Sequence, residues 1–149
     1  MAIVIGLNGK LYKNTGTYGS PTWTLVTKVM DLELKIEADQ FEVSNRAGGG
    51  YKEYVNTLVD AEISWGMPYD ASDTLLTSFQ TAARPGGSAI EFLVLDGLQA
   101  TTGSQGLRVT CAIKTASGRS EKLGEAMTIA VTAKPTPNAN SAPAWYTAP

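Results

Sequence analysis

The sequence predicts a mainly β domain, sandwich- or barrel-like, with one short flanking α-helix at about residues 71–83, a long glycine-rich loop and an extended C-terminal tail. Three observations support this class. Apolar and polar residues alternate with a period of two in several segments, one segment changes to a helical period, and glycine or proline clusters separate the segments. The chain has 149 residues, 43% of them hydrophobic. We expect a single β-rich domain over residues 1–134 that begins with an extended N-terminal arm of about residues 1–25.

The clearest strand is VMDLELKIE, in which four apolar residues alternate with charged ones: Met30, Leu32, Leu34 and Ile36. This alternation is typical of a strand with one buried face. It slips by one position at residues 38–40, because Phe41 and Val43 are the next apolar residues. We expect a bulge or a tight turn there, since a one-residue slip moves later side chains to the other face.

Further strands follow the glycine-rich loop. Alternation returns at Ala61, Ile63, Trp65 and Met67, and again in LRVTCAIK and AMTIAVTAK, which a Ser-Gly turn signal separates. The segment AIEFLVLD, residues 89–96, is nearly all apolar, which predicts a central strand covered on both faces. The expected total is five or six strands.

One segment between strands has a helical period. Five apolar residues fall on one helical face: Leu75, Leu76, Phe79, Ala82 and Ala83. Asp70 is the expected N-cap with Asp73 in the first turn, and Pro85 ends the helix. We expect the apolar stripe to cover one open end or face of the β core.

The last segment, residues 135–149, holds four prolines and small polar residues. It continues no predicted strand, so we expect a proline-rich extended tail. Two interpretations stay open: disorder, or docking of the isolated pair Trp145 and Tyr146 onto a neighbouring subunit.

Enzyme chemistry, cofactors and metals are not expected. The chain has no histidine and one cysteine, so the Ser-His-Asp and Cys-His pairs and the usual zinc ligand sets are missing. Cys111 lies on the apolar phase of its strand, which predicts a buried, inert thiol. Glu33 and Glu37 are interpreted as a solvated strand face, and the DASD segment at residues 70–73 as helix capping rather than a calcium loop.

Charge is unevenly distributed although the net charge is only −2. Residues 31–62 carry eight acids against three bases, whereas residues 1–30 carry three lysines and no acid. This pattern does not suit a basic nucleic-acid groove, but it suits copies of one protein that meet acidic face to basic face. No window approaches the roughly 18 apolar residues of a membrane span, and no leader is recognised, so we expect a cytosolic product with no membrane partner.

The loop RAGGGYKEY is the main candidate for contacts between subunits. Its candidate residues are Arg46, Gly48, Gly49, Gly50, Tyr51, Lys52 and Tyr54. Glycines let the loop bend, and tyrosine and arginine are favoured at interface centres. The alternative interpretation is a mobile hairpin tip without a partner.

The order of these parts resembles the major tail proteins, or tail tube proteins, of long-tailed bacteriophages. The resemblance lies in an acidic amphipathic strand (DLELKIEAD), a polar step (VSNR), the loop AGGGYKEY, the strand LVDAEISWGMPYD, a short helix and the strand IEFLVLDG. It covers roughly residues 25–97. Family members often have tryptophan where Tyr51 stands and a glycine step where Asn56 and Thr57 stand.

The resemblance implies a β-sandwich or barrel with a flanking helix, whose subunits close into hexameric rings that stack into a hollow tube. DNA would pass through this tube only transiently. The other implied partners are further copies of the chain and the tape measure, tail terminator and distal tail proteins. The implied location is the virion tail, with assembly in the host cytoplasm.

Acidic strand faces are the candidates for the wall of the bore. Negative charge would repel phosphates, whereas lysines would bind them and slow the DNA. The candidate residues are Asp31, Glu33, Glu37, Asp60 and Glu62. A second function remains possible: a capsid-decorating or adhesive virion module, in which Tyr51, Tyr54, Trp145 and Tyr146 contact a receptor or sugar.

Overall fold

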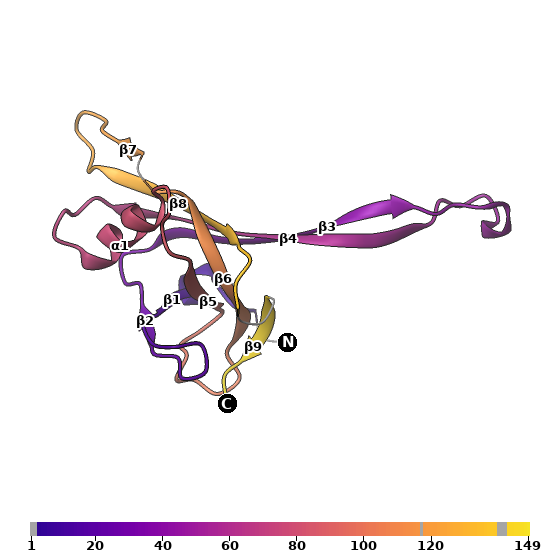
Figure 1. The fold of residues 1–149 in the computed structure, drawn as a ribbon, viewed down its shortest axis with the longest axis horizontal. Coiled ribbons are helices and arrows are strands. Elements are labelled where there is room, and N and C mark those ends of the chain that lie inside the picture. The colour runs from indigo at the N-terminus through magenta and orange to yellow at the C-terminus, as the bar shows by residue number, and fades with distance from the viewer. Residues whose placement is uncertain (1–2, 117, 140–142) are drawn as a thin grey trace.

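The computed structural model describes residues 3–116, 118–139 and 143–149, and within them nine strands form one antiparallel sheet (Figure 1). The strands are β1 (Lys10–Asn14), β2 (Trp23–Leu25), β3 (Met30–Glu42), β4 (Tyr54–Pro68), β5 (Ile90–Leu95), β6 (Gln105–Thr115), β7 (Arg119–Ser120), β8 (Thr128–Pro135) and β9 (Ala144–Thr147). The helices are α1 (Thr74–Ala82) and the short 3-10 helices η1 (Gly6–Asn8) and η2 (Arg46–Gly48). The prediction of a mainly β fold with one short α-helix is confirmed.

The strand order is β2-β1-β5-β6-β8-β4-β3, with β7 added beside β8 and β9 beside β6. Leu11 of β1 and Ile63 of β4 belong to one buried cluster although three strands separate β1 from β4. The sheet must therefore curve around its core. Helix α1 covers this core with Phe79, and its ring lies edge-on to Trp65 with centroids 5.4 Å apart.

Strand β5 is buried at all six positions. Phe92 belongs to the main cluster, while Leu93 and Leu95 face the other way and form a second cluster with Tyr12. The prediction of a central strand covered on both faces is confirmed.

The N-terminal region corrects two expectations. β1 and β2 lie in the region expected to be an extended arm, where β1 pairs with β5 and β2 pairs with β1. Leu11 and Tyr12 are both buried, one in each cluster. A five-residue strand with two apolar residues gives a weak local pattern, and its burial comes from a partner about 80 residues away. For the same reason the expected five or six strands were too few.

The start of α1 corrects the predicted cap. Asp73 is the N-cap, and its carboxylate accepts a hydrogen bond of 3.0 Å from the backbone N–H of Leu75. Asp70 accepts instead from the N–H of Ser72 and lies 2.8 Å from Lys28 Nζ. The hydrogen bond from Lys28 holds the pKa of Asp70 well below its usual range. The predicted apolar stripe of the helix packs on the core as expected.

Candidate assembly interface

Strands β3 and β4 run past the rest of the sheet as a two-stranded ribbon (Figure 1). β4 pairs with β8 only between Ile63 and Pro68, so further out its sole neighbour is β3. We call residues 35–60 the projecting hairpin. Every residue in it is exposed except Gly48, which is partly buried. The hairpin therefore has no cover from the part of its own chain that the structure describes.

The pairing of β3 with β4 contains two irregularities. Asp31 occupies the first, where φ is 49°, a left-handed value that is uncommon for a residue with a side chain. The second lies between the pairs Ala38–Val59 and Gln40–Asn56, where β4 contains one more residue than β3. The irregularity predicted at residues 38–40 is confirmed, but its extra residue lies in β4 and not in β3.

The candidate bore acids gather on one face of the ribbon. Glu37 pairs directly with Asp60, and Lys35 pairs with Glu62. Glu33 shares this face because side chains two apart on a strand point the same way. Four of the five predicted acids are thus brought together, whereas Asp31 lies in the first bulge.

Two lysines offset part of this negative charge. Lys134 of β8 lies 3.0 Å from Asp60 and 3.6 Å from Glu62, and the hydrogen bond with Asp60 raises the pKa of Lys134. Lys35 lies 3.2 Å from Glu37. No local sequence pattern links Lys134 to Asp60 and Glu62, because it is 72 or more residues away from them along the chain. Lys134 lies beside these two acids because β8 pairs with β4.

The hairpin tip is a hydrogen-bonded turn. Asn45 accepts a bond of 2.8 Å from the N–H of Ala47, and the N–H of Tyr51 donates to the carbonyl of Gly48 at 3.1 Å. Gly49 and Gly50 have φ values of 63° and 88°, which only glycine adopts without strain. All seven candidate residues lie in or beside this turn: Arg46 and Gly48 in η2, then Gly49, Gly50, Tyr51, Lys52 and Tyr54.

Large apolar side chains are exposed along the hairpin: Ile36, Phe41, Val43, Val55, Leu58 and Val59. Phe41 is 65% exposed and Leu58 74% exposed. Single exposed apolar residues are common, but several large ones on one hairpin are typical of a surface that binds a partner.

The C-terminal pair corrects the expectation of a tail without a strand. β9 pairs with β6, with Leu107 opposite Trp145. Tyr146 packs against the second cluster, and the indole N–H of the exposed Trp145 donates to Gln105 Oε1 at 3.2 Å. Both aromatic residues thus contact their own chain, and only Trp145 offers a large exposed surface.

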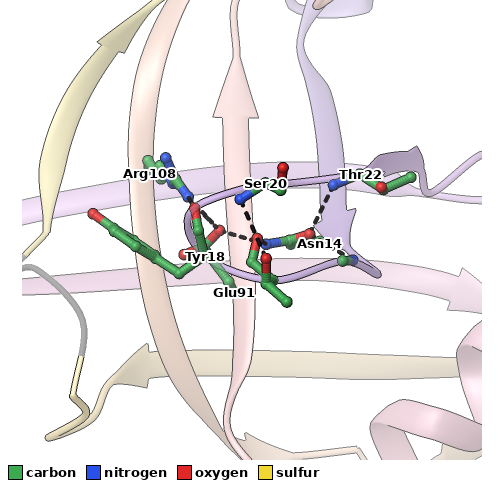
Figure 2. A network of polar contacts seen from close by, with 8 residues as sticks. Asn14, Tyr18, Ser20, Thr22, Glu91 and Arg108 are labelled. Atoms are coloured by element: carbon green, nitrogen blue, oxygen red, sulfur yellow. Dashed lines mark hydrogen bonds and ion pairs between the residues drawn. The ribbon is translucent and has the colours of Figure 1, made fainter.

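A buried polar network was missed by the sequence analysis (Figure 2). Glu91 Oε1 accepts hydrogen bonds from Asn14 at 2.9 Å and from Arg108 Nη2 at 3.0 Å. The same Arg108 nitrogen donates to the Tyr18 carbonyl at 2.7 Å, and the guanidinium lies over the Tyr18 and Trp23 rings. This network fixes the turn after β1 onto β5 and β6. The available signal was a glutamate inside the apolar run AIEFLVL, because a buried charge requires a partner.

The remaining candidates for chemistry are the single cysteine and the acidic side chains. Cys111 is buried, as predicted, and burial raises the pKa of its thiol to about 12. Within the described ranges no three histidine, cysteine, aspartate or glutamate side chains are grouped closely enough to hold a metal ion. Among those same residues, no helix has the length and apolar character needed to cross a membrane.

Comparisons with solved structures identify the fold. A chain in the tail of an empty gene transfer agent (GTA) particle, refined with helical C6 symmetry, has a TM-score of 0.67 and 16% identity over 96% of this chain and 97% of that one. A chain of the SPP1 tail tube has a TM-score of 0.66 and 11% identity, with coverages of 89% and 75%. A chain in the sheath–tube complex of an extracellular contractile injection system (PVC) has a TM-score of 0.64 and 9% identity, with coverages of 97% and 92%.

At the level of sequence, no family model and no curated protein matches this chain. The similarity to the solved structures is therefore a similarity of fold. It extends over nearly the whole chain and confirms, for the fold, the resemblance to tail tube proteins seen in the sequence.

Proposed function

Because the chain has the fold of these tail and tube components, we propose that it polymerises into stacked, hexameric rings that form the tail tube of a phage-type particle. The tube is the conduit for DNA during ejection. The role is structural and requires no chemistry from the chain. The GTA tail with the same fold was resolved with C6 symmetry, which supports the ring number.

The observation that carries the proposal is the uncovered projecting hairpin. An isolated two-stranded hairpin is at best marginally stable in water. The outer edge of β3, 13 residues long, also leaves backbone groups without a strand partner. Long open edges pair with other chains unless they are protected. Further copies of the chain would supply both the cover and the pairing.

Closure into rings follows from the kind of contact. The two ends of the sheet differ, since β3 forms one edge and the short β2 the other. Contacts between unlike surfaces run head to tail, and they close into a ring or extend as a filament. Through the ends of the tube the chain would meet the tape measure, tail terminator and distal tail proteins. Its place is the virion tail, after assembly in the host cytoplasm.

The acidic face of β3 and β4 is the proposed wall of the bore. It carries Glu33, Glu37, Asp60 and Glu62 against Lys35 and Lys134, an excess of negative charge that disfavours phosphate binding. Lys35 forms an ion pair with Glu37, and Lys134 forms ion pairs with Asp60 and Glu62. The wall is then negative without being a dense cluster of unpaired charge.

Electron microscopy of the purified chain at rising concentration tests the proposed function. Rings or tubes are expected. Deleting residues 47–50 removes the turn at the hairpin tip. The body, by which we mean the chain outside residues 35–60, should still unfold with unchanged cooperativity. Polymerisation should be lost. Tubes formed by the shortened chain would show that the tip is dispensable. A wild-type chain that stays monomeric at millimolar concentration, even with its particle partners, would refute the function itself.

A charge reversal tests the wall of the bore. Particles with Glu33→Lys and Glu37→Lys should assemble normally but eject DNA more slowly, because lysines bind passing phosphates. The matched control is Glu121→Lys with Glu125→Lys, which makes the same change of charge away from the hairpin. Ejection rates are measured by dye uptake of released DNA. Unchanged ejection in the first pair would exclude this face from the bore.

A further inference from the structure

We propose that the projecting hairpin is clamped between two different copies of this chain, one on each face, at different distances from the body. The inference rests on the proposed tube and adds which part of the hairpin each neighbour covers. We define the proximal stripe as Ile36, Ala38 and Val59, and the distal stripe as Phe41, Val43 and Val55.

The proximal stripe continues the core side of the sheet. Ile36 pairs with Ala61 and Ala38 with Val59, in the same register that pairs Leu34 with Ile63. Ala61 and Ile63 are buried, whereas Val59, on the same face of the same strand, is 66% exposed. The sequence pattern is unchanged along this row, and only the covering strands and helix end. We therefore expect an apolar surface of a neighbouring copy to cover the proximal stripe, as the core covers Ala61 and Ile63.

The distal stripe lies on the opposite face. Phe41 pairs with Val55, and on the regular strand β3 it shares its face with Glu37. On a regular strand Val55 and Val59, which are four positions apart, would share a face. The bulge instead places Val55 beside Phe41. Bulges commonly redirect side chains in this way.

Each face of the ribbon is thus half apolar and half polar. The face with the distal stripe carries Glu37 and Asp60 nearer the body. The face with the proximal stripe carries Gln40 and Asn56 further out, where the two amides hydrogen bond at 3.1 Å. One body packed along a whole face would bury charged or polar groups without partners, which is costly. Two bodies, staggered on opposite faces, bury only the two stripes.

Charges indicate that these bodies are copies of the same chain. On the hairpin, the carboxylates of Asp39 and Glu53 have no basic partner within ion-pair distance in the described ranges. On the body, Arg84, Lys114 and Lys122 have no acidic partner among those residues. Copies that meet hairpin to body bring these opposite charges together.

Site-specific photo-crosslinking within tubes tests the clamp. A benzophenone maleimide is attached at Val59→Cys, at Val55→Cys or at both, and labelled chains are assembled with a large excess of unlabelled wild-type chain. The buried Cys111 does not compete for the label. Each single label should give covalent dimers, and the double label should give covalent trimers, because its two sites touch different copies. Only dimers from the double label, or no crosslink at one site, would overturn the proposal.

A second measurement does not depend on the label. Val59→Asp and Val55→Asp should each reduce co-assembly with wild-type chain at least tenfold, whereas Asn56→Asp, on a polar half, should co-assemble normally. Equal co-assembly of all three variants would overturn the clamp while leaving the tube intact. Absence of tubes from wild-type chain would instead refute the proposed function, and the clamp with it.

Discussion

Strand β5 and the projecting hairpin belong to the same sheet, but their surroundings are opposite. All six residues of β5 are buried, with apolar clusters on both faces. The hairpin also carries large apolar side chains, among them Ile36, Phe41 and Val55, yet it is exposed throughout except at Gly48. Strand β5 therefore completes its burial within the chain, whereas the projecting hairpin does not. Stability and assembly should separate along this boundary.

The largest difference is expected between two phenylalanines. Phe92 is fully buried, with its ring 5.3 Å from that of Trp65, so Phe92→Ala should lower the free energy of unfolding by about 3–5 kcal/mol. Phe41→Ala, the matched change on the hairpin, should alter it by no more than about 0.5 kcal/mol, as is usual at the surface. Denaturant titration of the monomer measures both.

Among monomers that remain folded, tube assembly should be more sensitive to the substitution on the hairpin than to the one in the core. Phe41→Ala is expected to raise the concentration at which tubes appear, because Phe41 is 65% exposed in the monomer and available to a neighbour. A monomer destabilised equally by both substitutions would contradict the division between body and hairpin.

A smaller effect is expected at the hairpin tip. Gly49 has a left-handed φ of 63°, so Gly49→Ala should destabilise the turn by about 1 kcal/mol. The control is Gly48→Ala. At position 48 a Cβ would meet only the movable Glu53 carboxylate, at 3.1 Å, and no left-handed φ is required. Faster amide exchange at Tyr51, whose N–H closes the turn, is expected for the first variant. Unfolding of the body should be unchanged in both, and equal exchange in the two variants would argue against the turn.

The smallest effect is expected at the Lys28–Asp70 pair on the body, which is exposed. Its hydrogen bond lowers the pKa of Asp70 and raises the pKa of Lys28. The contribution of Asp70 is complete above the usual aspartate pKa of about 4 and is lost as the pH falls toward its lowered value. The contribution of Lys28 is complete below the usual lysine pKa of about 10.4 and is lost as the pH rises through its raised value.

A pH series of unfolding measurements tests this pair. The stability difference between wild type and Lys28→Gln should be constant from about pH 4 to about pH 10 and should shrink outside that window. Exchange rates at the hairpin tip should not respond to the substitution. A difference that grew in acid would have the wrong sign for this pair.

Local patterns in the sequence determined much of this protein. Alternation identified β3, β4, β6 and β8, the apolar run identified β5, and the helical period identified the stripe on α1. The slip at residues 38–40, the buried Cys111 and the resemblance to tail tube proteins were also available from the sequence. These features depend on side chains a few positions apart, and the backbone geometry of strands and helices fixes which of them share a face.

Only the tertiary structure decided which distant segments meet. It placed β1 and β9 in the sheet, brought Lys134 to Asp60 and Glu62, and joined Asn14, Glu91 and Arg108 in one buried network. It also showed that the pairing of β8 with β4 ends at Ile63, so that β3 and β4 continue as a two-stranded hairpin. A period of two shows which residues would be buried against a neighbour. Whether that neighbour lies in the same chain depends on pairings between strands far apart in sequence, which no local pattern encodes.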